Sequence, residues 1–218
     1  MIIESAELWA AGTNCYVIAQ EHGAKAVIVD APPDIEGVSA LLKGHDLLPV
    51  ALLVTHGHVD HAGGAGQVVE RTGVSAYLHP DDDWLASDPD SQLQGIFGFL
   101  PPERDQFAPP DRYTDLKHGD RLPLAGMTFE VRHTPGHTPG HCVFVVEDEG
   151  VVFSGDQLFA GSVGRTDLPR GDFRTLMESM ESEILTLDDD TRVLPGHGPE
   201  TTVRRERTTN PFIVGYTV

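Results

Sequence analysis

The 218-residue chain carries 34 acidic and 15 basic residues, which gives it a formal net charge of −19 at pH 7. Its length and its 39% hydrophobic content suffice for one domain with a sizeable core, so we expect residues 1–218 to form a single domain. So much negative charge repels phosphate backbones and anionic lipids, which argues against nucleic acid or a membrane as a partner. The oligomeric state is left open.

The cysteines and the N-terminus bear on localisation. Cys15 and Cys142 are too few for a disulfide framework, and they form no Cys-x-x-Cys pair. The first residues lack the basic start and the apolar run of a signal peptide, and no segment approaches about 18 consecutive apolar residues. We therefore expect a cytoplasmic protein.

The first half of the chain alternates strands with helices. Its predicted strands are residues 2–9, 14–19, 25–30, 49–55 and 74–79. Asp34 is expected to cap a helix that ends near Leu42, and a second helix is expected from about Gly63 to Arg71. The strand at 49–55 is continuously apolar, which is typical of a strand buried on both faces.

The second half repeats this order. Its predicted strands are residues 121–124, 127–132, 142–146, 151–154 and 191–194. Asp172 is expected to cap a helix whose apolar positions recur at helical spacing from Phe173 to Leu187, and residues 203–207 are expected to form a short terminal helix. Two such blocks bury both faces of each sheet only if the sheets stack and the helices cover the outside. The predicted fold is therefore an α/β (α+β) sandwich with four αββα layers.

Residues 80–115, between the two halves, interrupt the pattern. They are rich in proline and aspartate and carry scattered aromatic side chains. Loops of this length inside compact domains are usually functional lids or disordered segments. A surface insertion anchored by its aromatic side chains is the alternative, and whether these residues cover a substrate is left open.

The strongest chemical signal is the motif THGHVDH at residues 55–61, placed where the buried strand ends. In an extended segment His56 and His58 point to the same side, so both can bind one metal ion. A turn into the following helix would direct Asp60 and His61 elsewhere, which suits a second, neighbouring ion. The motif therefore indicates a site for two metals.

Three further candidate ligands follow other predicted strands: His137, Asp156 and His197. Because binding sites gather on loops at the carboxyl ends of strands, we expect these residues to converge with those of the motif. A lone histidine at a turn is usually only solvated. This many ligand-type residues in one structural setting indicates a metal site.

With these motifs the sequence resembles the glyoxalase II-type, or hydroxyacylglutathione hydrolase-like, members of the metallo-β-lactamase superfamily. The resemblance also includes residues 13–16, 29–30, 134–141, 155–169 and 195–199. It implies one metal ion on His56, His58 and His137, a second on Asp60, His61 and His197, Asp156 as the bridge between them, and Asp30 as an outer residue that steadies a ligand histidine.

Imidazole and carboxylate ligands without thiolate suit zinc, with iron or manganese as alternatives. Two ions lower the pKa of a shared water molecule. The resemblance implies that the resulting metal-bridging hydroxide attacks the carbonyl of a 2-hydroxyacyl thioester, a small-molecule substrate. Asp60 and Asp156 are then the candidate catalytic carboxylates.

The part of the site that selects the substrate is less well defined. In glyoxalase II-type enzymes a cation at the position of Arg165 meets a carboxylate of glutathione, so Arg165 is the candidate substrate-binding residue. Its alternative is an internal salt bridge to Asp167, Asp172 or another acidic partner. Asp167 stands where a substrate-binding tyrosine is expected, and only the 21 residues 198–218 follow His197. We therefore expect a short form that lacks the helical C-terminal domain, which puts glutathione itself in doubt.

Other functions stay open at this point. Persulfide dioxygenases resemble the chain in the same superfamily, share the segment GRTD at 164–167, and would use a single iron on His56, His137 and Asp156. The segments DQLF at 156–159 and PGHGP at 195–199 look more like those of the hydrolases. A lactonase or phosphodiesterase could use the same pair of metals. A noncatalytic metal-binding or interaction module is the last alternative.

Overall fold

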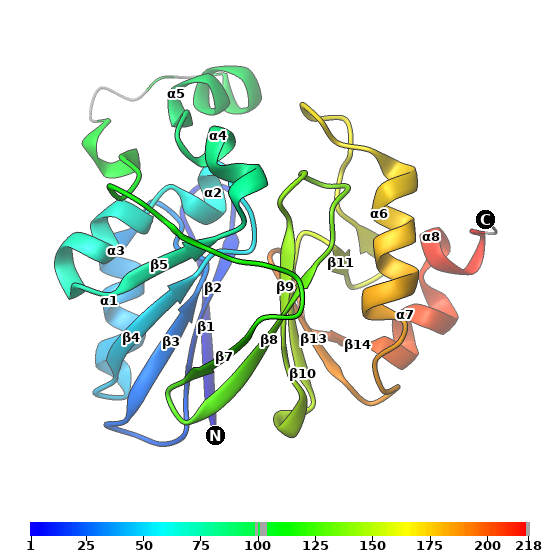
Figure 1. Cartoon of the computed structure of the whole chain (residues 1–218), viewed down its shortest axis with the longest axis horizontal. Helices are drawn as coiled ribbons and strands as arrows, with labels where there is room; N and C mark the ends of the chain where they lie inside the picture. The colour runs from blue at the N-terminus through cyan, green and yellow to red at the C-terminus, as the bar shows by residue number, and fades with distance from the viewer. Residues whose placement is uncertain (99, 101–103, 217–218) are drawn as a thin grey trace. The chain divides into compact units, whose positions relative to one another are not determined.

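The computed structural model describes residues 1–98, 100 and 104–216, and the chain divides into two compact units (Figure 1). Within these residues, the first unit comprises Met1–Leu116 and Pro123–Met127, and the second comprises Lys117–Leu122 and Thr128–Val218. These described residues form two six-stranded sheets and one two-stranded sheet.

The first sheet has the strand order β1-β2-β3-β4-β5-β6. Its strands are β1 (Ile2–Leu8), β2 (Thr13–Ala19), β3 (Lys25–Val29), β4 (Leu48–Leu53), β5 (Ser75–Leu78) and β6 (Thr114–Asp115). The first three strands pair antiparallel, whereas β3 to β6 pair in parallel. Because β3 and β4 are parallel neighbours, the loops that follow them start at the same edge of the sheet.

Helices α1 (Ile35–Gly44) and α3 (Ala65–Thr72) cover one face of this sheet (Figure 1). As predicted, the Asp34 carboxylate caps α1, since it accepts the backbone N–H of Gly37 at 2.9 Å. The core between helices and sheet is apolar and buried, and it includes Val17, Ile28, Val38, Leu52 and Val68. Removal of this apolar surface from water holds the two helices on the sheet.

The second sheet has the order β14-β13-β10-β9-β8-β7. Its strands are β7 (Arg121–Leu124), β8 (Met127–His133), β9 (Cys142–Val146), β10 (Val151–Gly155), β13 (Arg192–Pro195) and β14 (Thr201–Thr202). β10 and β13 are parallel neighbours, so their carboxyl ends also share one edge. A separate hairpin consists of β11 (Leu158–Phe159) and β12 (Ser162–Val163).

Helix α6 (Phe173–Ser179) packs on the second sheet together with α7 (Val203–Thr209), and α8 (Pro211–Val214) follows. Asp172 caps α6 as predicted, because its carboxylate accepts the N–H of Thr175. The prediction of a regular α-helix is wrong beyond Ser179, because the backbone there forms a π-helical turn, η5 (Met180–Ile184). Leu176, at the start of the buried stripe, is fully buried, whereas Phe173 is 40% exposed.

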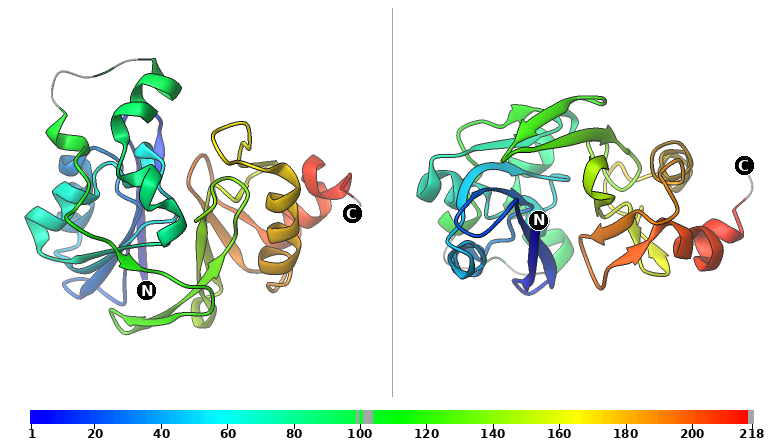
Figure 2. Two further views of the ribbon diagram at one scale, coloured as in Figure 1. Left: turned by 45° about the horizontal axis from the view of Figure 1, so that its top comes forward. Right: turned by 90° about the horizontal axis from the view of Figure 1, so that it is seen from below.

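The excursion at residues 80–115 folds into short helices. They are η1 (Pro80–Asp82), α4 (Asp83–Ala86), α5 (Pro89–Gln92), η2 (Leu93–Phe97) and η3 (Asp105–Phe107), drawn in green in Figure 2. Residues 99 and 101–103 of the excursion lie outside the described part of the chain. Buried Leu93 and Phe107 pack with Val59, and the Phe107 ring meets Trp9 edge-on at a centroid distance of 6.0 Å. Aromatic and aliphatic contacts thus hold the excursion against the rest of the first unit.

Several short elements are not predicted by the sequence, among them α2 (Val59–Ala62), β6, β11, β12, β14 and α8. Elements of two to four residues are too short to carry a readable hydrophobic period. Within the described ranges, no helix has both the length and the apolar character needed to cross a bilayer.

Candidate metal centre

Three histidines of the THGHVDH motif lie together beyond the carboxyl end of β4, in the first unit. His56, His58 and His61 are all at most 4% exposed. The ring centroid of His56 lies 4.8 Å from that of His58 and 4.1 Å from that of His61. Helix α2 begins directly after His58, and its turn returns His61 to the side of His56.

Asp60, on the same helical turn, lies beside His61. Its Oδ2 is 3.4 Å from His61 Nε2 and accepts the hydroxyl of Thr13 at 2.9 Å. Two ligand atoms bound tetrahedrally to a metal at about 2.1 Å are separated by about 3.4 Å. The carboxylate oxygen and the imidazole nitrogen therefore have the spacing of two ligands of one ion.

Asp30 supports this cluster from the loop after β3. Its carboxylate accepts the backbone N–H of Thr55 at 2.7 Å and the Thr55 hydroxyl at 2.9 Å. The same carboxylate lies 2.7 Å from Nδ1 of His61. Asp30 is 2% exposed and has a φ of 60°, in the left-handed region. This strained backbone places the carboxylate between the end of β4 and His61.

The other three predicted ligands form a cluster in the second unit. His137 follows β8, Asp156 directly follows β10, and His197 follows β13. Oδ2 of Asp156 lies 3.5 Å from Nε2 of His137 and 3.7 Å from Nε2 of His197. These distances also match the separation of ligands around a metal. Nδ1 of His137 lies 2.7 Å from the carbonyl oxygen of Arg165.

His141 is fully buried and has a structural role beside Asp156. Its Nδ1 lies 2.8 Å from the hydroxyl of Thr134, and its Nε2 accepts the backbone N–H of Asp156 at 3.0 Å. Because Nε2 accepts this hydrogen bond, it carries no proton itself. His141 thus holds the backbone of Asp156 in place.

Arg165 contacts the second cluster through its backbone, and its side chain pairs with Asp167. The guanidinium donates two hydrogen bonds to the Asp167 carboxylate, at 2.7 and 2.8 Å. Both side chains are more than half exposed. The hydrogen-bonded guanidinium lowers the pKa of Asp167 to about 2. This is the internal salt bridge that the sequence left open as the alternative for Arg165.

The structure also shows polar residues around the first cluster that the sequence motifs do not reveal. Thr13, Asp82 and Gln92 hydrogen-bond to Asp60 or to the backbone of the motif. Asp82 and Gln92 belong to the excursion, which has no periodic pattern. Thr13 lies within the segment 13–16 that carries the resemblance, and this position is the signal that could have identified it.

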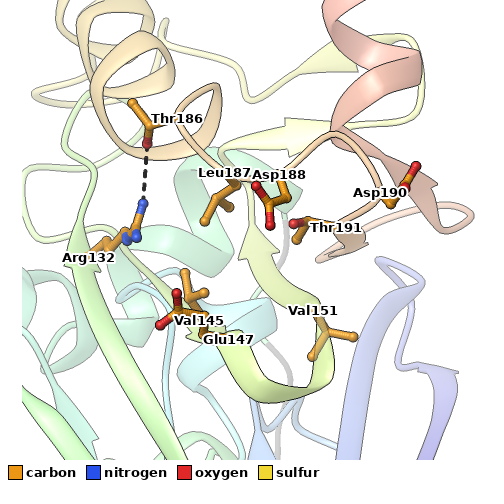
Figure 3. Close-up of a pocket in the computed structure, with 10 residues that line it drawn as sticks. Arg132, Val145, Glu147, Val151, Thr186, Leu187, Asp188, Asp190 and Thr191 are labelled. Atoms are coloured by element: carbon orange, nitrogen blue, oxygen red, sulfur yellow. Dashed lines mark hydrogen bonds between the residues drawn. The ribbon is translucent and has the colours of Figure 1, made fainter.

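A cavity of about 260 Å³ in the second unit lies among Arg132, Val145, Glu147, Gly150, Val151, Thr186, Leu187, Asp188, Asp190 and Thr191 (Figure 3). Arg132 donates to Thr186 across it. Val151 begins β10, whereas Asp156 follows the other end of that strand. None of the predicted ligands lines this cavity, so it is not part of the candidate metal centre.

The comparison of the sequence with protein-family models identifies its relatives. The model described as "Metallo-beta-lactamase superfamily" matches residues 8–197. The chain belongs to the metallo-β-lactamase superfamily. A protein of Haemophilus influenzae named hydroxyacylglutathione hydrolase GloC is 39% identical over 213 residues, which cover 98% of each chain.

Solved structures of this superfamily resemble the chain closely. One is titled as the B3 metallo-beta-lactamase BLEG-1, with a TM-score of 0.87 and 35% identity, and the match covers 98% of this chain and all of that one. Another is titled as a di-iron-bound form of TTHA1623, with a TM-score of 0.85, 39% identity, and coverage of 96% and 99%. The predicted metallo-β-lactamase fold is thereby confirmed, as is membership of a superfamily of metallo-hydrolases.

Proposed function

We propose that the protein is a metal-dependent hydrolase that cleaves the thioester of a small-molecule thiol, and that its two clusters together hold two divalent metal ions. One ion is assigned to His56, His58 and His137. The other is assigned to Asp60, His61 and His197, with Asp156 as the shared ligand. The superfamily match supports this pairing of the clusters because it extends over both units.

The observation that carries the proposal is the hydrogen bond of His137. A carbonyl oxygen can only accept, so Nδ1 of His137 bears the proton that binds the Arg165 carbonyl. In the neutral imidazole this leaves the lone pair on Nε2, which faces the carboxylate of Asp156. His61 is similar, because its Nδ1 meets the Asp30 carboxylate while its Nε2 lies beside Asp60. Second hydrogen bonds of this kind orient metal-binding histidines.

When bound, two such ions would lower the pKa of a water molecule toward neutrality and polarise the scissile carbonyl. The chain has to hold the ligands in fixed positions for this chemistry. Asp30 and the Arg165 carbonyl orient two imidazoles, and His141 fixes the backbone of Asp156. The burial of His56, His58, His61 and His137 excludes bulk water around them and strengthens their electrostatic interactions.

A thioester is the favoured substrate class because the Haemophilus influenzae relative is named for hydrolysis of an acylated glutathione. Hydrolysis transfers the acyl group to water, breaks the carbon–sulfur bond and releases a thiol and an acid. Arg165 is proposed to meet a carboxylate of the thiol. That carboxylate has to compete with Asp167, which already occupies the guanidinium.

Substitution of the proposed shared ligand tests the function. We expect the Asp156→Ala variant to bind less metal and to hydrolyse thioesters at least a hundredfold more slowly. The substitution removes a carboxylate that lies between two imidazoles. Asp148→Ala, at an exposed acid in the turn before β10, is the matched control and should leave both unchanged. Near-normal activity of Asp156→Ala with normal metal content would refute the proposal.

A further inference from the structure

The excursion makes direct hydrogen bonds to the loop that carries the first-unit ligands. We call residues 55–61 the ligand loop. The backbone N–H of Gly57 donates to the Asp82 carboxylate at 2.9 Å, and the N–H of Val59 donates to the Gln92 side-chain oxygen at 2.8 Å. The Gln92 amide donates in return to the Gly57 carbonyl at 3.2 Å and to the Leu85 carbonyl at 2.7 Å. Two excursion side chains thus hold the backbone on both sides of His58.

These contacts are shielded from solvent. Asp82 is fully buried and Gln92 is 6% exposed. A backbone N–H buried without an acceptor is strongly unfavourable, so loss of either side chain gives the ligand loop a tendency to move toward water. The hydrogen bond of the Asp82 carboxylate is also of the charge-assisted kind, which is stronger than a neutral one.

The ligand loop also packs closely against the backbone of the excursion. A Cβ added to Gly57 would lie 2.8 Å from the Asp82 carbonyl oxygen and 3.0 Å from the Ala86 backbone nitrogen. Glycine is therefore the residue that allows the ligand loop to approach the excursion backbone. Leu93, directly after Gln92, packs against Val59 and fixes the same segment through apolar contact.

We propose that Asp82 and Gln92 are positioning residues that set the metal affinity of the ligand loop, and that residues 80–93 are a fixed support for it rather than a mobile lid. The inference rests on the proposed function, because it assigns His56, His58 and His61 to metal ions. Neither side chain is proposed to touch metal or substrate. Both act through the backbone of Gly57 and Val59.

The test is the zinc affinity of the apoprotein, measured by competition with a chelator, together with the absorption spectrum of the cobalt form. Asp82→Ala and Gln92→Met remove the hydrogen bonds, and we expect zinc binding weaker by about 10- to 100-fold, the loss typical of residues that orient ligands. Asp82→Asn keeps an acceptor oxygen for Gly57 and should restore most of the affinity. The cobalt spectra of Asp82→Ala and Gln92→Met should change, since the ligand geometry changes.

Asp88→Ala is the matched control within the same excursion. Its carboxylate also accepts a backbone N–H, that of Ser91, but this bond caps α5 and is exposed. The control should lower the free energy of unfolding slightly and leave zinc affinity unchanged. If Asp82→Ala does not fold, Gln92→Met and Asp82→Asn decide the question.

Two results separate the inference from the proposed function. If wild-type apoprotein binds no zinc or cobalt, the proposed function fails. If wild-type protein binds metal and folded Gln92→Met binds it equally well with the same cobalt spectrum, the inference alone is overturned. Hydrogen exchange gives a second readout, because a fixed support protects the amides of Gly57 and Val59, whereas a mobile lid would expose them.

Discussion

Asp30 and His61 are joined by a hydrogen bond of 2.7 Å between the carboxylate and Nδ1, and both side chains are almost fully buried. The aspartate holds this position with a φ of 60°, which costs free energy for a residue other than glycine. The backbone N–H of Ala31 donates a further hydrogen bond to the carbonyl oxygen of His61 at 2.7 Å. The loop after β3 and helix α2 are thus tied together at the histidine that we assign to the second metal.

We predict that Asp30→Ala weakens both the fold and the metal site. It removes the acceptor of a buried backbone N–H and of the Thr55 hydroxyl, so we expect about 3 kcal/mol of destabilisation, measured by denaturant unfolding. Metal affinity should fall by about 10- to 100-fold, because His61 loses its orienting partner.

Asp30→Asn is the control for the change at this position. Asparagine tolerates a positive φ and keeps an oxygen acceptor, so the backbone can stay as it is. Asp30→Asn should therefore lower the free energy of unfolding less than Asp30→Ala does. Equal metal affinity in Asp30→Ala and wild type would remove Asp30 from the proposed site.

Gly136, the residue before His137, should tolerate no side chain. It has a φ of 134°, and an added Cβ would lie 2.2 Å from the backbone nitrogen of Leu176 in α6. We expect Gly136→Ala to destabilise the protein by about 3 kcal/mol or more, because strain and overlap add. Gly150→Ala, at a φ of 62° with open space around it, should cost only about 1 kcal/mol. Similar denaturation midpoints for the two variants would contradict this packing.

The ion pair of Arg165 and Asp167 should persist into strong acid. The pKa of Asp167 is lowered to about 2 by its hydrogen bonds with the guanidinium, and a carboxyl group with a lowered pKa favours the folded state above its unfolded pKa. That contribution is lost as the pH falls through about 2. A carbon-detected NMR titration should place the Asp167 midpoint near this value, and Arg165→Gln should return it toward the ordinary value of about 4. A midpoint already near 4 in the wild type would show that the pair does not form in solution.

Long elements and the ligand motifs were predictable because each has a local cause. The caps at Asp34 and Asp172 follow from the preference of aspartate for helix N-termini. The apolar run at residues 49–55 predicted a buried strand, and β4 is buried over its last three residues, Ala51–Leu53. The superfamily could be predicted from motifs such as THGHVDH, because metal ligands need fixed spacing along the chain. The comparisons confirm the superfamily and the fold.

Features that depend on distant contacts were not predictable. The bonds from Asp82 and Gln92 to the ligand loop join segments 25 and 33 residues apart, and no local pattern encodes them. The π-helical turn after Ser179 keeps Met180 and Ile184 buried, so the periodicity of apolar residues looked regular although the backbone is not. The left-handed φ of Asp30 is likewise imposed by its bonds to Thr55 and His61.

Metal quantification on protein purified without added metals, combined with thioester hydrolysis by the same sample, is the decisive measurement. We predict two divalent ions per chain, and thioester turnover that is lost when a chelator removes them and recovered when zinc is restored. A single iron per chain with oxygen uptake on a persulfide substrate, or a fully loaded protein that hydrolyses no thioester, would contradict the proposed function.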